Sequence, residues 1–180
     1  MRILGIAIGS VTATALVTVG IAVGGFGSAA AAPGDYSTLP VDPNVVTDST
    51  AYSAAAPILN PNGQPGVTAV YTHRDGTRQI TNTILILPDA ASATAALNGP
   101  DLASRVVNGK TQPASIGTGG TIITGSSPDG SKSVSVLQFA EGNAVTTMEF
   151  DGSKSDPAPV DLITEFGQKQ DAAIKGWEGA

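Results

Sequence analysis

Hydrophobic and polar residues alternate along two stretches that are separated by a short polar segment. Residues 67–73 place Val, Ala, Tyr and His at every second position, and residues 80–86 do the same with Ile and Asn. A period of two puts alternate side chains on opposite faces of a strand. Asp75-Gly76 lies between the stretches, and this dipeptide is typical of a tight turn. The pattern therefore predicts a β-hairpin with His73 beside its turn.

Three more strands are predicted in the second half of the chain, at residues 121–125, 133–139 and 144–150. Asp129-Gly130 and Gly142-Asn143 favour turns between them. The outward positions are mainly Ser and Thr, which is typical of an antiparallel sheet with one solvated face.

Helices are predicted between and after these strands. Asp89 is a suitable N-cap for a helix that ends at Asn98-Gly99-Pro100, and residues 101–107 favour a second short helix. A longer C-terminal helix is expected to begin with Asp156 as its cap and Pro157 at its first position. Its apolar stripe comprises Val160, Ile163, Phe166 or Gly167, Ile174 and Trp177.

The order of elements is then β-β-α-β-β-β-α. It predicts an α+β fold in which an antiparallel sheet of about five strands carries its helices on one face. We assign residues 67–180 to this single domain.

The segment before this domain has a different composition. Residues 32–66 are rich in Pro, Ser and Thr, with prolines at positions 33, 40, 43, 57, 61 and 65. Such spacing disfavours long helices and ladder pairing. We expect an extended lead-in that partly packs on the domain, with a short helix near residues 48–56 and tight turns over residues 60–66. A stalk with O-linked sugar is the alternative.

The first 31 residues have the pattern of a secretory signal peptide. Met1-Arg2 precedes an uncharged apolar run that ends in small residues, and Ala29 and Ala31 suit the signal-peptidase positions. Cleavage near Ala31-Ala32 would release a secreted protein that is not anchored in a membrane. An uncleaved membrane anchor is the alternative, because the run is long enough to span a bilayer.

Cysteine content and net charge limit the ways in which this protein can be stabilised, anchored and bound. The chain has no cysteine, so neither a disulfide nor a lipidated cysteine can form. It has fifteen acidic and nine basic residues, for a net charge of −6. An acidic protein is a poor match for nucleic acid or for anionic lipid.

No motif in the sequence carries recognisable chemistry. His73 is the only histidine, no Gly-x-Ser-x-Gly segment occurs, and Asp75 sits in the turn rather than where it would orient the imidazole. We therefore interpret His73 as a solvated turn residue. One histidine without cysteine excludes an ordinary zinc site. Asn108-Gly109-Lys110-Thr111 resembles part of a phosphate loop, but Ser104 replaces its first glycine, and we expect a plain loop there. No cofactor is expected.

Asn82 is the one polar residue on the predicted buried face of its strand. A buried amide needs hydrogen-bond partners. We expect either a structural asparagine held by the protein or, together with Ile84, part of the lining of a ligand cavity.

Several segments together resemble secreted proteins of mycobacteria and related actinobacteria. They are the alanine-rich leader, the Pro/Thr-rich lead-in, "ILILPDAASATAAL" at residues 84–97 and "PVDLITEFGQKQDAAIK" at residues 159–175. The order of elements is similar to extracellular sensor-like domains and small exported lipoproteins of those bacteria. The chain departs from them in having neither disulfides nor an acylated cysteine. The resemblance implies a binding or envelope-associated role without catalysis, and it transfers no functional residue.

The sequence thus favours a secreted, non-enzymatic protein that binds a small apolar ligand or a cell-envelope partner. Two alternatives remain. The first is a hydrolase with an unrecognised site, for which His73 is the only candidate general base. The second is a structural or surface-antigen protein with no ligand.

Overall fold

A computed structural model describes residues 35–97, 99 and 101–177. The predicted signal peptide, with Ala29 and Ala31, lies outside the described residues, and so do Asn98 and Pro100 of the predicted helix stop. None of the helices in these ranges has the length and hydropathy needed to span a bilayer.

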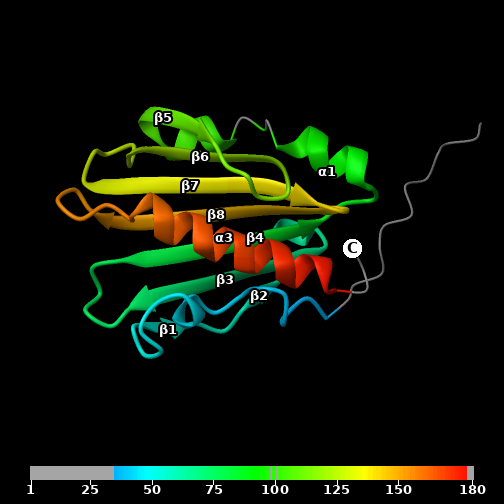
Figure 1. The fold of residues 1–180 in the computed structure, drawn as a ribbon, viewed down its shortest axis with the longest axis horizontal. Helices are drawn as coiled ribbons and strands as arrows, with labels where there is room; N and C mark the ends of the chain where they lie inside the picture. The colour runs from blue at the N-terminus through cyan, green and yellow to red at the C-terminus, as the bar shows by residue number, and fades with distance from the viewer. Residues whose placement is uncertain (1–34, 98, 100, 178–180) are drawn as a thin grey trace, which may run out of the picture.

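The fold is built on one antiparallel sheet of eight strands (Figure 1). The strands follow the order β1-β3-β4-β8-β7-β6-β5, and β2 pairs with β3 next to β1. Their bounds are β1 Tyr52–Ala54, β2 Ile58–Leu59, β3 Gly66–His73, β4 Gln79–Ile86, β5 Val107–Pro113, β6 Thr118–Ser126, β7 Lys132–Glu141 and β8 Ala144–Ser153.

The α+β class is confirmed, but the expected number of about five strands is wrong. The additional strands are β1, β2 and β5. β1 and β2 have only three and two residues, too few to show an alternating pattern. β5 is an edge strand whose residues after Val107 are all exposed, so no buried face marked it in the sequence. The region around Lys110 is thus a strand and not a loop.

The predicted β3–β4 hairpin is confirmed. Thr72 pairs with Gln79, and the His73 amide donates to the Arg78 carbonyl oxygen at 2.9 Å. Gly76 closes the turn with φ 72°, a left-handed conformation that glycine adopts without strain.

The first predicted helix is confirmed as α1, Ala90–Ala96. Its N-cap is Asp89, whose side chain accepts a hydrogen bond from the Ser92 amide at 2.7 Å. α2 follows as Asp101–Arg105, so the second predicted helix is also present. The predicted helix near residues 48–56 is wrong. Tyr52–Ala54 extends instead to pair with β3, and the short 3₁₀ helix η1 lies earlier, at Pro43–Val45.

The C-terminal helix α3 begins later than expected, at Val160, and runs to Lys175. Its N-cap is Pro159, which is extended at ψ 139° and makes no side-chain cap. A proline biases the residue before it toward extended backbone, so Pro159 delays the start of the helix. Asp156 therefore does not cap α3, and its carboxylate pairs with Arg78.

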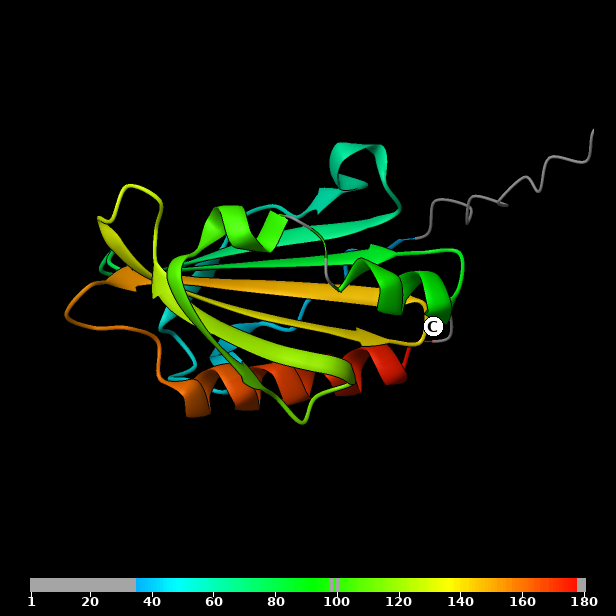
Figure 2. The same ribbon diagram turned by 90° about the horizontal axis from the view of Figure 1, so that it is seen from above.

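Helices cover both faces of the sheet, which corrects the expectation that they share one face. α1 and α2 lie on one side and α3 on the other (Figure 2). We call these sides the α1 face and the α3 face. The central strand β7 is buried at every position from Ser133 to Ala140, as a strand covered on both faces should be. The half-solvated pattern expected for this part of the sheet appears in β8, which alternates between buried and partly exposed positions from Thr146 to Gly152, and also in β3 and β4.

The main core lies between the sheet and α3. Ile163, Phe166 and Ile174 of α3 pack against residues of β4, β7 and β8, and the Phe150 and Phe166 rings meet edge to face at 6.1 Å. Trp177 is only partly buried and packs edge-on against Tyr36 at 5.8 Å.

Part of the lead-in belongs to this core. Tyr36 and Leu39 are 2 % and 3 % exposed. Gln170 of α3 is fully buried, and its Oε1 accepts from the Val41 amide at 2.9 Å while its Nε2 donates to the Leu39 carbonyl at 2.9 Å. Buried apolar contacts and a buried amide therefore hold residues 36–41 against α3.

We expect Tyr71 to ionise late in an alkaline titration. Burial, followed by the nearby Asp42 charge, raises its pKa to about 12 from the ordinary 10.0. A raised pKa means that the native state favours the neutral phenol. This contribution to stability is complete below pH 10 and is lost as the pH rises through about 12.

Phenolate absorbance and circular dichroism, recorded together, measure this coupling. The last tyrosine step should coincide with unfolding in the wild type and be missing in Tyr71→Phe. Ionisation of Tyr71 near pH 10 with the fold intact would contradict the expected burial effect.

Candidate functional site

The main candidate site is a groove on the α1 face, which we call the α1-face groove. It has a volume of ≈ 400 Å³, within the range of small-molecule sites. Its floor is the part of the sheet that α1 and α2 leave uncovered. Its lining residues are Pro61, Asn62, Gln64, Thr68, Thr81, Thr83, Leu85, Ala96, Gly99, Leu102, Arg105, Gln138, Val145 and Thr147.

The floor is a row of polar side chains across four adjacent strands. Thr68 of β3 lies opposite Thr83 of β4, Thr83 lies opposite Thr147 of β8, and Thr147 lies opposite Gln138 of β7. The Thr68 and Thr83 hydroxyl oxygens are 3.0 Å apart. These residues share a face because they occupy paired positions in an antiparallel register, in which side chains alternate between faces.

The walls of the groove come from segments that are distant in sequence. Ala96 of α1 and Leu102 of α2 form one side. The short 3₁₀ helix η2, Pro61–Gly63, forms the other and rises on the same side of the sheet as α1 and α2 (Figure 2). Leu85 and Val145 add aliphatic surface. The η2 side adds Pro61, Asn62 and Gln64, so the groove offers a small ligand aliphatic contact on one side and hydrogen bonds from the floor and the η2 side.

Gln138 is the most buried polar residue of the floor, at 7 % exposed. Its Nε2 donates to Thr147 Oγ1 at 3.3 Å. Its Oε1 is buried and has no hydrogen-bond partner among the described residues. Buried polar atoms are nearly always hydrogen-bonded, so this oxygen is an acceptor whose capacity the described residues leave unused.

Arg105 is the one charged side chain in the groove lining, and its partner lies just outside it. Arg105 Nη1 bonds to Glu149 Oε2 at 2.8 Å. Across residues 35–97, 99 and 101–177, no group of three or more His, Asp or Glu side chains is placed to hold a metal ion. The groove therefore offers hydrogen bonds and aliphatic contact, with little net charge.

Asn82 and Ile84 lie on the opposite face of β4. Both are fully buried in the core, and neither lines the α1-face groove. Asn82 Nδ2 donates to Gln170 Oε1 at 2.8 Å, so Asn82 is a buried asparagine with a partner in the protein. A ligand cavity at these two residues stays a prediction.

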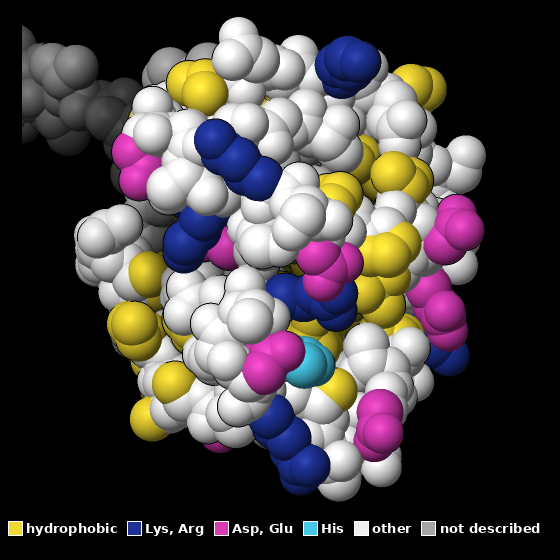
Figure 3. Space-filling model, turned by 90° about the vertical axis from the view of Figure 1, so that its left-hand side faces the viewer, with side chains coloured by type: hydrophobic (Ala, Val, Ile, Leu, Met, Phe, Trp, Pro, Cys, Tyr) yellow, Lys and Arg dark blue, Asp and Glu magenta, His cyan; other side chains and the backbone are white. Residues whose placement is uncertain are grey.

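His73 lies at the end of the molecule that carries the β3–β4 turn, among side chains of both charges (Figure 3). Its Nδ1 is 2.6 Å from Asp75 Oδ1, and its ring meets Tyr52 edge-on at 5.2 Å. The expectation that Asp75, as a turn residue, would not orient the imidazole is thus wrong. Bonds to the Thr77 hydroxyl and amide, and then to His73, hold the pKa of Asp75 well below its usual range.

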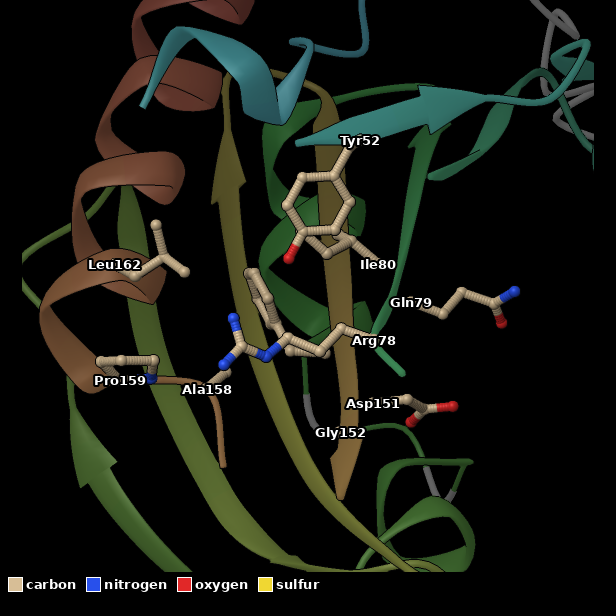
Figure 4. A pocket seen from close by; sticks show the side chains of 10 residues that line it. Tyr52, Arg78, Gln79, Ile80, Asp151, Gly152, Ala158, Pro159 and Leu162 are labelled. Atoms are coloured by element: carbon tan, nitrogen blue, oxygen red, sulfur yellow. The ribbon is translucent and has the colours of Figure 1, made fainter. Parts of the chain in front are cut away.

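This His–Asp pair does not form a triad. Among the described residues, no serine or threonine hydroxyl bonds to the imidazole, and a serine nucleophile requires one. A pocket near this end, between Tyr52, Arg78 and Leu162 (Figure 4), has a volume of ≈ 10 Å³. That space holds about one water molecule and no substrate.

The fold and groove together define an α+β protein with helices on both faces of one antiparallel sheet and a ligand-sized groove on one of them. No protein-family model matches the chain, and neither a curated protein nor a solved structure matches it. The groove is therefore the feature of this protein that bears on its function.

Sequence reasoning missed this site. The alternation of residues 80–86 did place Thr81 and Thr83 on the outward face. The alternation could not show that β4 pairs with β8, which adds Thr147 to the row. It also could not show where α1, α2 and η2 lie, and these elements form the walls.

Proposed function

We propose that this chain is a secreted, non-enzymatic protein that binds a small apolar ligand in the α1-face groove. The observation that carries the proposal is the groove of ≈ 400 Å³ between α1, α2 and η2. Small-ligand sites are typically concave, mostly apolar and equipped with a few polar groups. Leu85, Leu102 and Val145 supply the apolar contacts here.

Other observations support the secreted and the non-enzymatic parts of this proposal. The leader ending at Ala29-Ala30-Ala31 favours export, and the resemblance to exported actinobacterial proteins favours the cell envelope as the source of the ligand. The one His–Asp pair lies at the β3–β4 turn and does not line the groove. A cell-envelope protein is the alternative occupant.

Thr81→Trp tests the proposal by filling the groove. Thr81 lines the floor on β4, whereas Thr72 on β3 faces the same side of the sheet outside the groove. We expect native mass spectra of wild type and Thr72→Trp, purified from the host's culture medium, to show added mass that disappears on denaturation. Thr81→Trp should lack that mass.

Each other result of this experiment is informative. A native wild-type mass equal to residues 32–180 alone would contradict the ligand and favour a structural role. Added mass of polypeptide size would identify a protein partner instead. A mass that retains residues 1–31 would contradict cleavage of the leader.

A further inference from the structure

We infer that the ligand of the α1-face groove carries a neutral hydrogen-bond donor, a hydroxyl or an amide N–H, and that Gln138 Oε1 accepts it. This inference rests on the proposed function, because it concerns the chemistry of the same groove. It makes Gln138 the residue that determines which apolar molecules bind.

The first support is the position of Gln138 in the sheet. Within the groove it ends the polar row that starts at Thr68 and crosses Thr83 and Thr147. Thr121 of β6 pairs with Gln138 on the other side but does not line the groove. β7 is an interior strand of the sheet. On the α1 face of β7, the side chains on either side of Gln138 are Val136 and Ala140, which are buried beside α2 and α1, respectively. Gln138 therefore interrupts an apolar strip at the edge of the groove.

The second support is that only one of the two polar atoms of the Gln138 amide has a hydrogen-bond partner. Nε2 is engaged by Thr147 Oγ1 at 3.3 Å, and Oε1 is buried without a partner among the described residues. This oxygen is already out of contact with water, so an alkyl ligand without a donor would leave it unpaired and gain no hydrogen bond from it. A ligand with a hydroxyl at this point would satisfy it.

The third support is the charge of the surroundings. Arg105 and Glu149 bond to each other, so neither needs an ionic ligand. A carboxylate beside Gln138 would place two acceptors together, and an ammonium would lose its hydration for a single carbonyl oxygen. A neutral donor is the group that fits.

Octan-1-ol and its isomer 1-methoxyheptane test the inference on the wild-type protein. The two probes have the same atoms, but only the alcohol can donate a hydrogen bond. We expect chemical-shift titrations, followed at the amides of Thr81, Thr83 and Thr147, to show tighter binding of the alcohol by about five- to tenfold. Such a ratio corresponds to one buried neutral hydrogen bond.

Gln138→Leu removes the acceptor, and Gln79→Leu is the matched control on the same sheet face outside the groove. The preference for the alcohol should vanish in Gln138→Leu, with both probes binding about equally, and persist in Gln79→Leu. Circular dichroism checks that both variants fold, and the wild-type comparison stands without them.

The outcomes separate the two proposals. Equal binding of the two probes to the wild type would overturn the role of Gln138 and leave the apolar groove intact. A preference that survives in Gln138→Leu would also overturn it. Failure of both probes to shift any groove amide would overturn the inference together with the proposed function.

Discussion

Replacing Gln170 by alanine is expected to lower the free energy of unfolding by about 3–5 kcal/mol. Gln170 is fully buried, and its amide makes three hydrogen bonds, to Asn82, Val41 and Leu39. Removing it leaves the Asn82 and Leu39 partners buried and unpaired, and the part-buried Val41 amide without its acceptor. The larger part of the loss is this desolvation, because each hydrogen bond contributes only about 1 kcal/mol net when both partners are satisfied.

Urea unfolding of Gln170→Ala and Gln168→Ala measures the effect. Gln168 lies on the same helix and is exposed, so its replacement should change stability by less than about 0.5 kcal/mol. Equal midpoints for the two variants would show that the Gln170 amide does not hold the lead-in to the core.

A smaller m-value in Gln170→Ala would add a further finding. The m-value scales with the surface exposed on unfolding. Release of residues 36–41 from α3 before global unfolding would lower it, and Tyr36 would then lose its edge contact with Trp177. Tryptophan fluorescence reports that release directly.

Gly66→Ala is the second substitution with a large expected effect, a loss of about 3–5 kcal/mol. Gly66 begins β3 with φ 145°, a conformation that side-chain-bearing residues rarely adopt. A Cβ at this position would also overlap the carbonyl oxygen of Ile84 on β4. Neither backbone can shift freely, because β3 and β4 pair from Gly66–Leu85 onward.

Gly130→Ala is the matched control, since Gly130 has φ 67° but a Cβ there would meet open space. It should lose only about 1–2 kcal/mol, the cost of the left-handed backbone alone. Thermal unfolding of both variants separates backbone conformation from steric overlap. Equal losses would show that the β3–β4 contact adapts to the added methyl group.

The elements that the sequence predicted correctly are those in which the signal is local. Asp75-Gly76 between two alternating stretches specified the β3–β4 hairpin, and Asp89 before an alanine-rich run specified the start of α1. Each depends on residues within a few positions of one another, which interact before any tertiary contact forms. The buried face of β4, including the amide of Asn82, was predicted for the same reason.

Other features depended on partners far along the chain. β5 is a strand because β6 offers it an edge, although its own residues are mostly exposed. Asp156 had the sequence of a helix cap, but Pro159 keeps the backbone extended and Arg78 of the hairpin pairs with its carboxylate. Gln170 had no visible role in the sequence, since its partners lie 88 to 131 residues away.

By itself, the sequence determined the α+β class, the central hairpin and the helix start at Asp89. Only the tertiary structure decided that α1 and α2 cover one face and α3 the other, and that a groove remains between α1, α2 and η2. The physical reason is that alternation marks which side chains share a face of one strand. Alternation does not specify which strands pair with that strand or which helices cover it, and these neighbouring elements form the groove.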